Sequence, residues 1–152
     1  MGKGLVIGLI VLVILVIGGY FTYNAFFTDS CKNLSNAQSE KDNCYADLAV
    51  EKQKVSLCEK IEFEGYIYDC YIDLAVDKGD SSICTKIDQN DFHRWDICHK
   101  EVATKINDVS LCEEIIDENS MGDCYMEIAI QTNNIALCEK ANVKEFCEGK
   151  FA

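Results

Sequence analysis

Residues 44–61 read CYADLAVEKQKVSLCEKI, and residues 70–87 repeat the pattern as CYIDLAVDKGDSSICTKI. Two further copies follow, CHKEVATKINDVSLCEEI at 98–115 and CYMEIAIQTNNIALCEKA at 124–141, so the period is 26 or 28 residues. A repeat of this length predicts a stack of small supersecondary units, in which each unit packs on its neighbours. Each copy holds two cysteines, and the same pattern therefore also sets out a disulfide framework.

The first half of each copy predicts an amphipathic helix, here called helix A. The cysteine, an aliphatic residue four positions later and an alanine five positions later fall on one helical face. The small alanine allows a neighbouring helix to come close. An acidic residue stands three positions after each cysteine, and on stacked helices these carboxylates would form a row along one surface. We call this row the acidic ladder; it consists of Asp47, Asp73, Glu101 and Glu127.

The second half of each copy predicts a short helix B of about two turns, too short to be stable alone. A residue suited to a helix N-cap stands four positions before the cysteine in three copies, and Lys54 breaks this pattern in the first. The three predicted N-caps are Asp80, Asp108 and Asn134. Gly79 and Asn107 suit the left-handed end of the preceding helix A. The chain contains no proline, which is consistent with uninterrupted helices.

The ten cysteines allow two pairing schemes. Antiparallel B–A hairpins place Cys58 level with Cys70, which predicts the pairs 31–44, 58–70, 84–98, 112–124 and 138–147. A constant gap of 14 residues instead favours A–B hairpins, which leave Cys31 and Cys147 without a local partner. Each bridge would close a short loop and contribute about 3 kcal/mol in the chain-entropy model. The cysteines are Cys31, Cys44, Cys58, Cys70, Cys84, Cys98, Cys112, Cys124, Cys138 and Cys147.

Stacked helical hairpins predict an all-α fold, a disulfide-stapled α-solenoid. This plan resembles tetratricopeptide and Sel1-like arrays, although the period is shorter than about 34 residues and the Trp-Leu-Gly-Tyr consensus of the former is absent. The blocks from Asp108 to Ile115 and from Cys70 to Ala75 also resemble uncharacterised cysteine-rich helical-repeat membrane proteins predicted from archaeal genomes. That resemblance covers residues 29–152 and implies no particular activity.

The N-terminal region has a different character. Residues 5–27, LVIGLIVLVILVIGGYFTYNAFF, carry no charge and would rise about 35 Å as a helix, enough to cross a bilayer core of about 30 Å. We therefore predict a transmembrane signal anchor at residues 1–28, followed by a domain of about five B–A hairpins at 29–152. A cleaved signal peptide is the alternative, but Tyr23 stands where a cleavage site needs a small residue.

Charge predicts the orientation and limits the partners. Lys3 precedes the apolar stretch, and all 26 acidic residues lie at Asp29 or later, so we expect a cytoplasmic N-terminus and an extracytoplasmic repeat domain. Ten cysteines agree with an oxidising exterior. A net charge of −12 makes nucleic acid an unsuitable partner. Asn33 begins a sequon, which predicts a glycosylation site on an exported domain.

Two groups of residues are candidates for binding. The acidic ladder suits a cation or a basic peptide, and the alternative is an ordinary solvated face. His93, Arg94 and Trp95 form the clearest departure from the repeat and predict a recognition spot, with simple packing as the alternative. Cysteine pairs at CxxC spacing are absent, so we expect no zinc site. No catalytic triad, phosphate loop or nucleotide fingerprint is present, so we expect neither catalysis nor a cofactor.

These features together predict a non-catalytic, membrane-anchored scaffold at the cell surface. It would bind a protein partner of basic character, whose identity the sequence does not give. Two alternatives stay open at this point. The chain could be a structural subunit of an envelope assembly or filament, in which copies associate with one another. It could also be a thiol–disulfide accessory protein that uses an exchangeable bridge.

Overall fold

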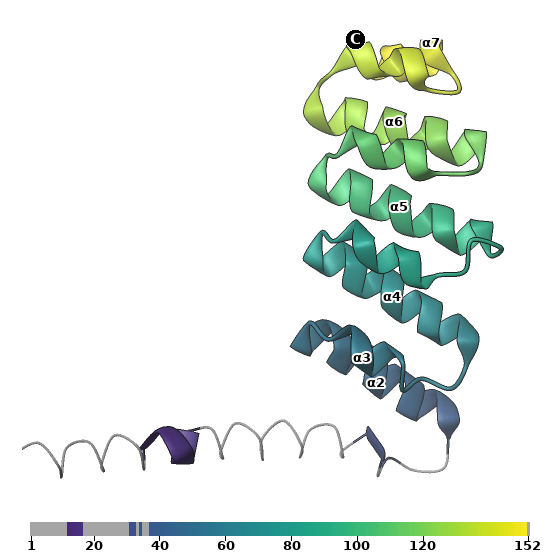
Figure 1. Ribbon diagram of the computed structural model, residues 1–152. Helices are drawn as coiled ribbons and strands as arrows, with labels where there is room; N and C mark the ends of the chain where they lie inside the picture. Colours follow the sequence, from purple (N-terminus) through teal and green to yellow (C-terminus); the bar gives the residue numbers. More distant parts are fainter. Residues whose placement is uncertain (1–11, 17–30, 33, 35–36, 152) are drawn as a thin grey trace, which may run out of the picture.

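The computed structural model describes residues 12–16, 31–32, 34 and 37–151, and within them the chain is helical with no strand. Four long helices form one layer and short helical elements form the other, stacked in chain order from α2 to α7 (Figure 1). The long A helices are α2 (Gln38–Lys52), α4 (Glu64–Lys78), α5 (Phe92–Ile106) and α6 (Glu118–Thr132). The B elements are α3 (Val55–Cys58), η1 (Ser81–Lys86), η2 (Val109–Glu114) and η3 (Ile135–Lys140). The stack ends with α7 (Lys144–Glu148) and η4 (Gly149–Phe151).

The disulfides follow the B–A hairpins, so the predicted pairing is confirmed and the rival pairing at 14-residue spacing is wrong. Each bridge joins a B element, or the short helical piece at residues 31–32, to the helix after it, with Cα atoms 5.5–5.7 Å apart. That helix is an A helix in four bridges and α7 in the last. All ten cysteines are paired. The pairs are Cys31–Cys44, Cys58–Cys70, Cys84–Cys98, Cys112–Cys124 and Cys138–Cys147.

The A helices begin and end at repeated positions. Each of the four has 15 residues and is followed by one residue in the left-handed conformation. The predicted ends at Gly79 and Asn107 are confirmed, with φ of 63° and 57°. Gln53 and Asn133 adopt the same conformation, although neither was predicted to do so. Glycine avoids the steric cost that the other three residues carry there.

The B elements η1, η2 and η3 begin at the predicted N-caps. The side chains of Asp80, Asp108 and Asn134 each accept a hydrogen bond from the backbone N–H two residues later. Lys54 cannot accept such a bond, and the first B element is a single α-helical turn. The other three are six-residue 3₁₀ helices, the tighter form that short helical segments often take.

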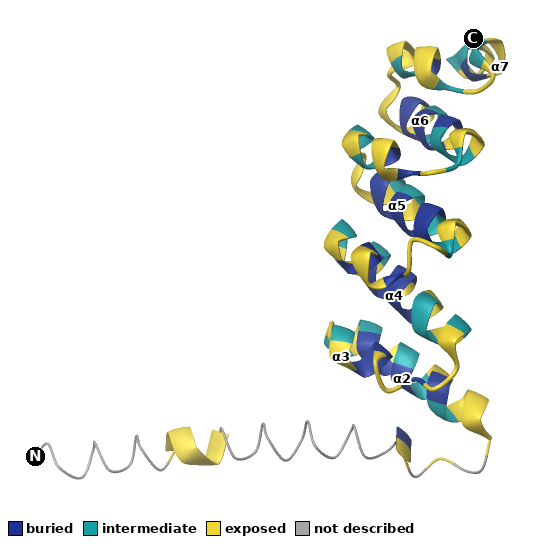
Figure 2. Ribbon diagram, turned by 45° about the vertical axis from the view of Figure 1, so that its right-hand side comes forward, coloured by how far each residue is buried: buried dark blue, intermediate teal, exposed yellow. Residues whose placement is uncertain are grey.

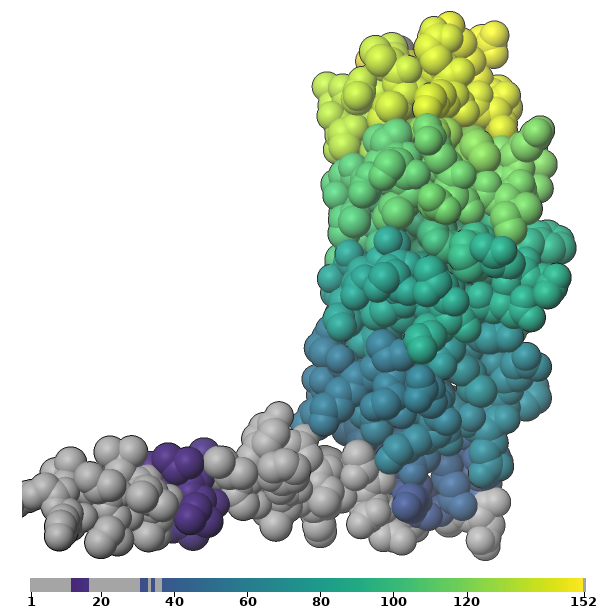
Figure 3. Space-filling view, in the orientation of Figure 1, coloured from purple at the N-terminus to yellow at the C-terminus, as the bar shows by residue number. Residues whose placement is uncertain are grey.

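The core runs along the whole stack, between the two layers (Figure 2). The alanine five positions after each A-helix cysteine is fully buried in all four copies, as the repeat predicts: Ala49, Ala75, Ala103 and Ala129. Leu74, Val102 and Ile128 beside them are also fully buried. Neighbouring A helices pack directly on one another, which gives the elongated column of Figure 3.

Two buried carboxylates accompany the alternation of the repeat between 26 and 28 residues. Asp42 of α2 accepts hydrogen bonds from the backbone N–H groups of Glu62 and Phe63 in the next B–A loop. Asp96 of α5 does the same for Ile116 and Asp117. Both of these loops belong to the hairpins whose cysteines are 12 residues apart. The hairpin between them, with a spacing of 14, lacks such a carboxylate because Tyr68 stands at the equivalent place in α4.

The transmembrane part of the predicted fold is contradicted. No helix among the described residues is both long and apolar enough to cross a membrane. Of the predicted span, residues 12–16 are described, and they are helical. The remaining residues of that span, and the predicted glycosylation site at Asn33, lie outside the described residues.

Candidate binding surface on the A helices

The structure brings the acidic ladder together on the outer face of the A layer. One ladder residue comes from each of α2, α4, α5 and α6, and Asp47, Asp73 and Glu101 are exposed. Consecutive A helices pack on one another, so the two middle carboxylates, Asp73 and Glu101, feel the charges of their neighbours in the ladder. Burial raises the pKa of Asp73, and the charges of Asp69 and Asp47 raise it further. The ladder is therefore a row of mutually repelling charges.

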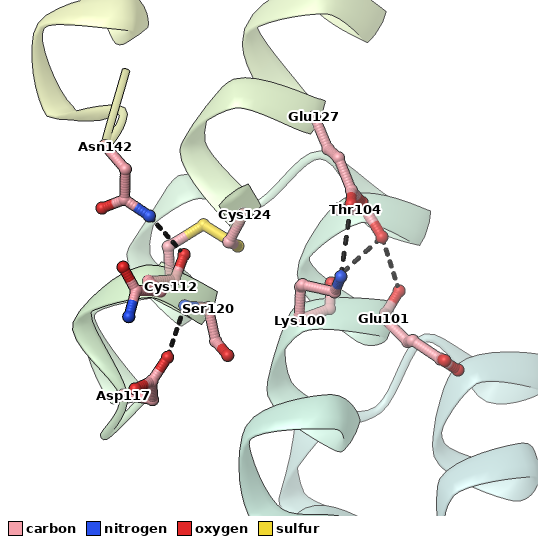
Figure 4. Close-up of polar contacts among 10 residues, drawn as sticks. Lys100, Glu101, Thr104, Cys112, Asp117, Ser120, Cys124, Glu127 and Asn142 are labelled. Carbon is pink, nitrogen blue, oxygen red and sulfur yellow. Dashed lines mark hydrogen bonds and ion pairs between the residues drawn. A yellow bond between two sulfur atoms is a disulfide. The ribbon is translucent and has the colours of Figure 1, made fainter. Parts of the chain in front are cut away.

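The middle of the ladder shows the same effect. Burial raises the pKa of Glu101, the charges of Asp73 and Glu127 add to this, and Lys100 opposes it. The Nζ atom of Lys100 lies 3.3 Å from Oε1 of Glu127 on the next helix, so this base neutralises one end of the ladder. Figure 4 shows Lys100 directed at Glu127, whereas the carboxylate of Glu101 points away from that pair. Lys100 thus pairs directly with Glu127 and compensates the charge of Glu101 only in part.

A shallow groove of about 350 Å³ lies between α4 and α5, at the centre of the ladder. It brings two ladder residues together with two residues of the predicted recognition spot, His93 and Arg94. Ile72 and Ile97 add apolar surface. The complete lining is Asp69, Ile72, Asp73, His93, Arg94, Ile97 and Glu101. The groove thus combines apolar contact with an excess of negative charge.

Trp95 lies elsewhere. Its side chain is buried, its indole N–H donates to the backbone carbonyl of Glu114 at 3.0 Å, and its ring centroid lies 4.5 Å from that of His99. The structure therefore separates Trp95 from His93 and Arg94 and gives it a packing role between α5 and η2.

Arg94 is held by groups that sequence patterns did not single out. Its guanidinium lies 2.9 Å from Asp91, 3.6 Å from Asp69 and 5.8 Å from the ring centroid of Tyr68. The hydrogen bond from Arg94 lowers the pKa of Asp91 and raises that of Arg94 itself. Asp69 and Tyr68 stand one and two positions before the cysteine of their helix, where the repeat shows no constant residue type. Their role becomes visible only when α4 and α5 are packed together.

A second groove, of about 420 Å³, continues the surface from Glu101 towards α6. It is lined by Val76, Glu101, Thr104, Lys105 and Gln131. Because Glu101 lines both grooves, the two grooves form one candidate surface over α4, α5 and α6. Such an open and extended surface suits a peptide or protein segment better than a small molecule, which prefers an enclosed pocket.

Within the part of the chain that the structure describes, no three His, Cys, Asp or Glu residues are grouped so that they could hold a metal ion. The ladder carboxylates are therefore arranged as a row and not as a chelating cluster. No protein-family model, curated protein or solved structure matches the chain.

Proposed function

We propose that this protein is a non-catalytic scaffold whose A-helix face binds a basic protein segment. The observation that carries the proposal is the acidic ladder, which crosses four packed helices and borders two connected grooves. Burial and like-charge repulsion raise the pKa of both Asp73 and Glu101, so a basic partner would relieve an existing electrostatic cost.

The stapled architecture supports this role because it presents the charges on a rigid surface. Each hairpin is closed by its own disulfide, and the side chains that bind need little reordering when a partner arrives. The same disulfides are typical of an oxidising compartment, and we place the repeat domain outside the cytoplasm. Nine of the ten cysteines are buried, which favours structural bridges over the thiol–disulfide exchange considered as an alternative.

The experiment is a binding titration of the full chain with a fluorescently labelled Lys/Ala-rich helical peptide, followed by anisotropy. The double variant Asp73→Asn/Glu101→Gln should bind about tenfold more weakly than the unchanged protein. The matched control, Glu59→Gln/Glu114→Gln, removes two exposed carboxylates from the B layer and should bind almost normally. Raising the salt from about 20 mM to about 500 mM should weaken peptide binding by the unchanged protein. The difference in peptide affinity between the unchanged protein and Asp73→Asn/Glu101→Gln should become smaller. If the two double variants lost the same peptide affinity, the effect would come from net charge alone and the proposal would be overturned.

Self-assembly is a second candidate, because the last hairpin leaves apolar side chains uncovered. Val143 and Phe146 at the end of the stack are 56% and 54% exposed. A second copy that continues the stack would cover them, as repeat arrays need a neighbour or a polar cap at each end. Light scattering after size-exclusion chromatography would test this candidate: it predicts oligomers that Phe146→Ser dissociates, and a monomer at all concentrations contradicts it.

A further inference from the structure

The B–A loop after η1 differs from its neighbours in how it is capped. In α2 and α5, a buried aspartate two positions before the cysteine binds the backbone of the next loop. In α4 that position holds Tyr68, and the next loop supplies its own cap. There, Asp88 accepts hydrogen bonds from the backbone N–H and the side-chain amide of Asn90, at 2.9 and 2.8 Å. Asp42 and Asp96 each bind the backbone of the next B–A loop, but within the described residues no side chain of α4 binds the backbone of this longer loop.

A pocket of about 310 Å³ opens at this place, between the first turns of α4 and the longer loop. Phe63 and Tyr68 contribute aromatic surface, and Phe63 is 63% exposed. Gly65 lies under both side chains: a Cβ atom there would lie 3.0 Å from the ring of Phe63 and 3.4 Å from the guanidinium of Arg94, so a larger residue would require these side chains to shift slightly.

The charges around this pocket favour a cation. Glu64, Asp88 and Asp91 line it, against one base, Arg94. The hydrogen bond from Tyr68 to Glu64, together with burial and the charges of Glu64, Asp88 and Asp91, raises the pKa of Tyr68, in agreement with a negative local potential.

The chain itself shows which chemistry this constellation accepts. The guanidinium of Arg94 already sits between Asp91 and Asp69, close to the ring of Tyr68. Proteins recognise arginine and lysine side chains by two features: carboxylates that form ion pairs with the cation, and an aromatic ring that packs beside it. Each of the three carboxylates already has a hydrogen-bond partner, but only Asp91 is paired with a base, so the pocket keeps a net negative charge that a further cation would balance.

We propose that this pocket, which we call the anchor pocket, binds one arginine or lysine side chain of the basic segment. The inference rests on the proposed function and deepens it, because it names where the partner is fixed. Arg94 lines both the anchor pocket and the groove beside Asp73 and Glu101. One side chain in the anchor pocket therefore sets the register of the remaining basic residues along the acidic ladder.

The test uses the ¹⁵N-labelled full chain and a small probe, N-acetyl-arginine methylamide, with N-acetyl-glutamine methylamide as the uncharged control. The arginine probe should shift the amide resonances of residues 63–68 and 88–94, and the glutamine probe should not. Phe63→Ala and Glu64→Gln should each weaken this binding about three- to fivefold, the size of one exposed cation–π contact or one lost charge. Phe146→Ala, an equally exposed aromatic at the far end, should leave it unchanged.

The outcomes separate the two proposals. Uniform small shifts over all acidic surfaces, or equal effects of Phe63→Ala and Phe146→Ala, would overturn the anchor pocket even if the Lys/Ala-rich peptide binds to the ladder. Specific shifts by the arginine probe without any binding of that peptide would support the anchor pocket and contradict the proposed function. Phe63 is largely exposed and Glu64→Gln keeps an acceptor for Tyr68, so both variants should fold, as circular dichroism would verify.

Discussion

Single buried carboxylates determine how neighbouring hairpins join. Asp96 is 4% exposed and accepts hydrogen bonds from the amides of Ile116 and Asp117 at 2.7 and 2.9 Å. Asp42 is fully buried and does the same for Glu62 and Phe63, at 3.2 and 3.3 Å. A carboxylate in this position satisfies two backbone donors at once, because it offers two acceptor oxygens.

Asp96→Ala should therefore lower the free energy of unfolding by about 2–3 kcal/mol, the cost of leaving buried donors without an acceptor. Urea unfolding followed by circular dichroism measures this. Asp123→Ala is the matched control, since Asp123 is exposed on α6, and it should change stability by less than about 0.5 kcal/mol. If the two variants lost the same stability, the loop-capping role of Asp96 would be wrong.

The acidic ladder should cost stability when it is charged. The native pKa of Asp73 is raised, so the native state holds its proton more tightly than the unfolded chain. The protonated Asp73 therefore adds to the free energy of unfolding. This stabilisation is fully present below the unfolded pKa of about 4 and is lost as the pH rises through the native pKa. Asp73→Asn should therefore stabilise the protein at pH 7, by about 0.5 kcal/mol or less because the side chain is exposed and screened.

Thermal unfolding at pH 3 and pH 7 measures the effect of Asp73→Asn. The gain should vanish at about pH 3, where the aspartate is protonated in both states. Glu114→Gln, outside the ladder, serves as the control and should show no gain at either pH. A loss of stability for Asp73→Asn at pH 7 would mean that the ladder is not under repulsion.

At the level of elements, the A helices depend on one left-handed residue at each C-terminus. Gly79 has φ of 63°, and a Cβ atom there would lie 2.8 Å from Cγ2 of Ile106. Gly79→Ala should cost about 2 kcal/mol, from backbone strain and the contact together. Asn133→Gly at the equivalent end of α6 should leave stability unchanged or raise it by up to about 1 kcal/mol.

Chemical denaturation of the two variants tests this expectation. Opposite or clearly unequal changes for Gly79→Ala and Asn133→Gly would support the role of the left-handed residue. Equal destabilisation would instead assign the effect to lost helix-terminal contacts at both places.

The elements were predicted well where the sequence repeats, and poorly where the outcome depends on how neighbours pack. The N-caps at Asp80, Asp108 and Asn134 and the ends at Gly79 and Asn107 follow from local backbone chemistry, which acts within a few residues. The 3₁₀ form of the B elements was not predicted, because a six-residue segment fits either helix type until it packs.

The candidate site shows the same limit. The ladder was visible in the sequence because its carboxylates recur at one position of the repeat, whereas Tyr68, Asp69 and Asp91 come together only when α4 packs on α5. Trp95 is a conspicuous residue type in the sequence, and it is buried beside His99, which agrees with the packing alternative given for it. The transmembrane helix was predicted from the length and uncharged character of residues 5–27, and no helix among the described residues is long and apolar enough to cross a membrane.

For the whole molecule, the position of a disulfide in the stack should decide what its loss does. Repeat proteins are stabilised by contacts between neighbours, so a central defect divides the stack and a terminal one frays only its end. Cys84→Ala/Cys98→Ala should cost about 3 kcal/mol and speed hydrogen exchange in α4 and α5 on either side. Cys138→Ala/Cys147→Ala should speed exchange mainly in α7 and the end of α6.

Hydrogen exchange with mass spectrometry compares the two double variants residue by residue. Uniform acceleration over the whole chain in both variants would contradict the stacked description, because it would mean that the domain unfolds as one unit. Local acceleration in both would support it.

A disulfide map of the protein, obtained by non-reducing digestion and mass spectrometry after free thiols have been alkylated, would decide between the two pairing schemes of the cysteines. The fold, the rigid acidic ladder and the anchor pocket all depend on one bridge in each B–A hairpin. The account predicts the five pairs Cys31–Cys44, Cys58–Cys70, Cys84–Cys98, Cys112–Cys124 and Cys138–Cys147, with no free thiol. Bridges at 14-residue spacing such as 44–58, or alkylated thiols in the freshly isolated protein, would contradict it.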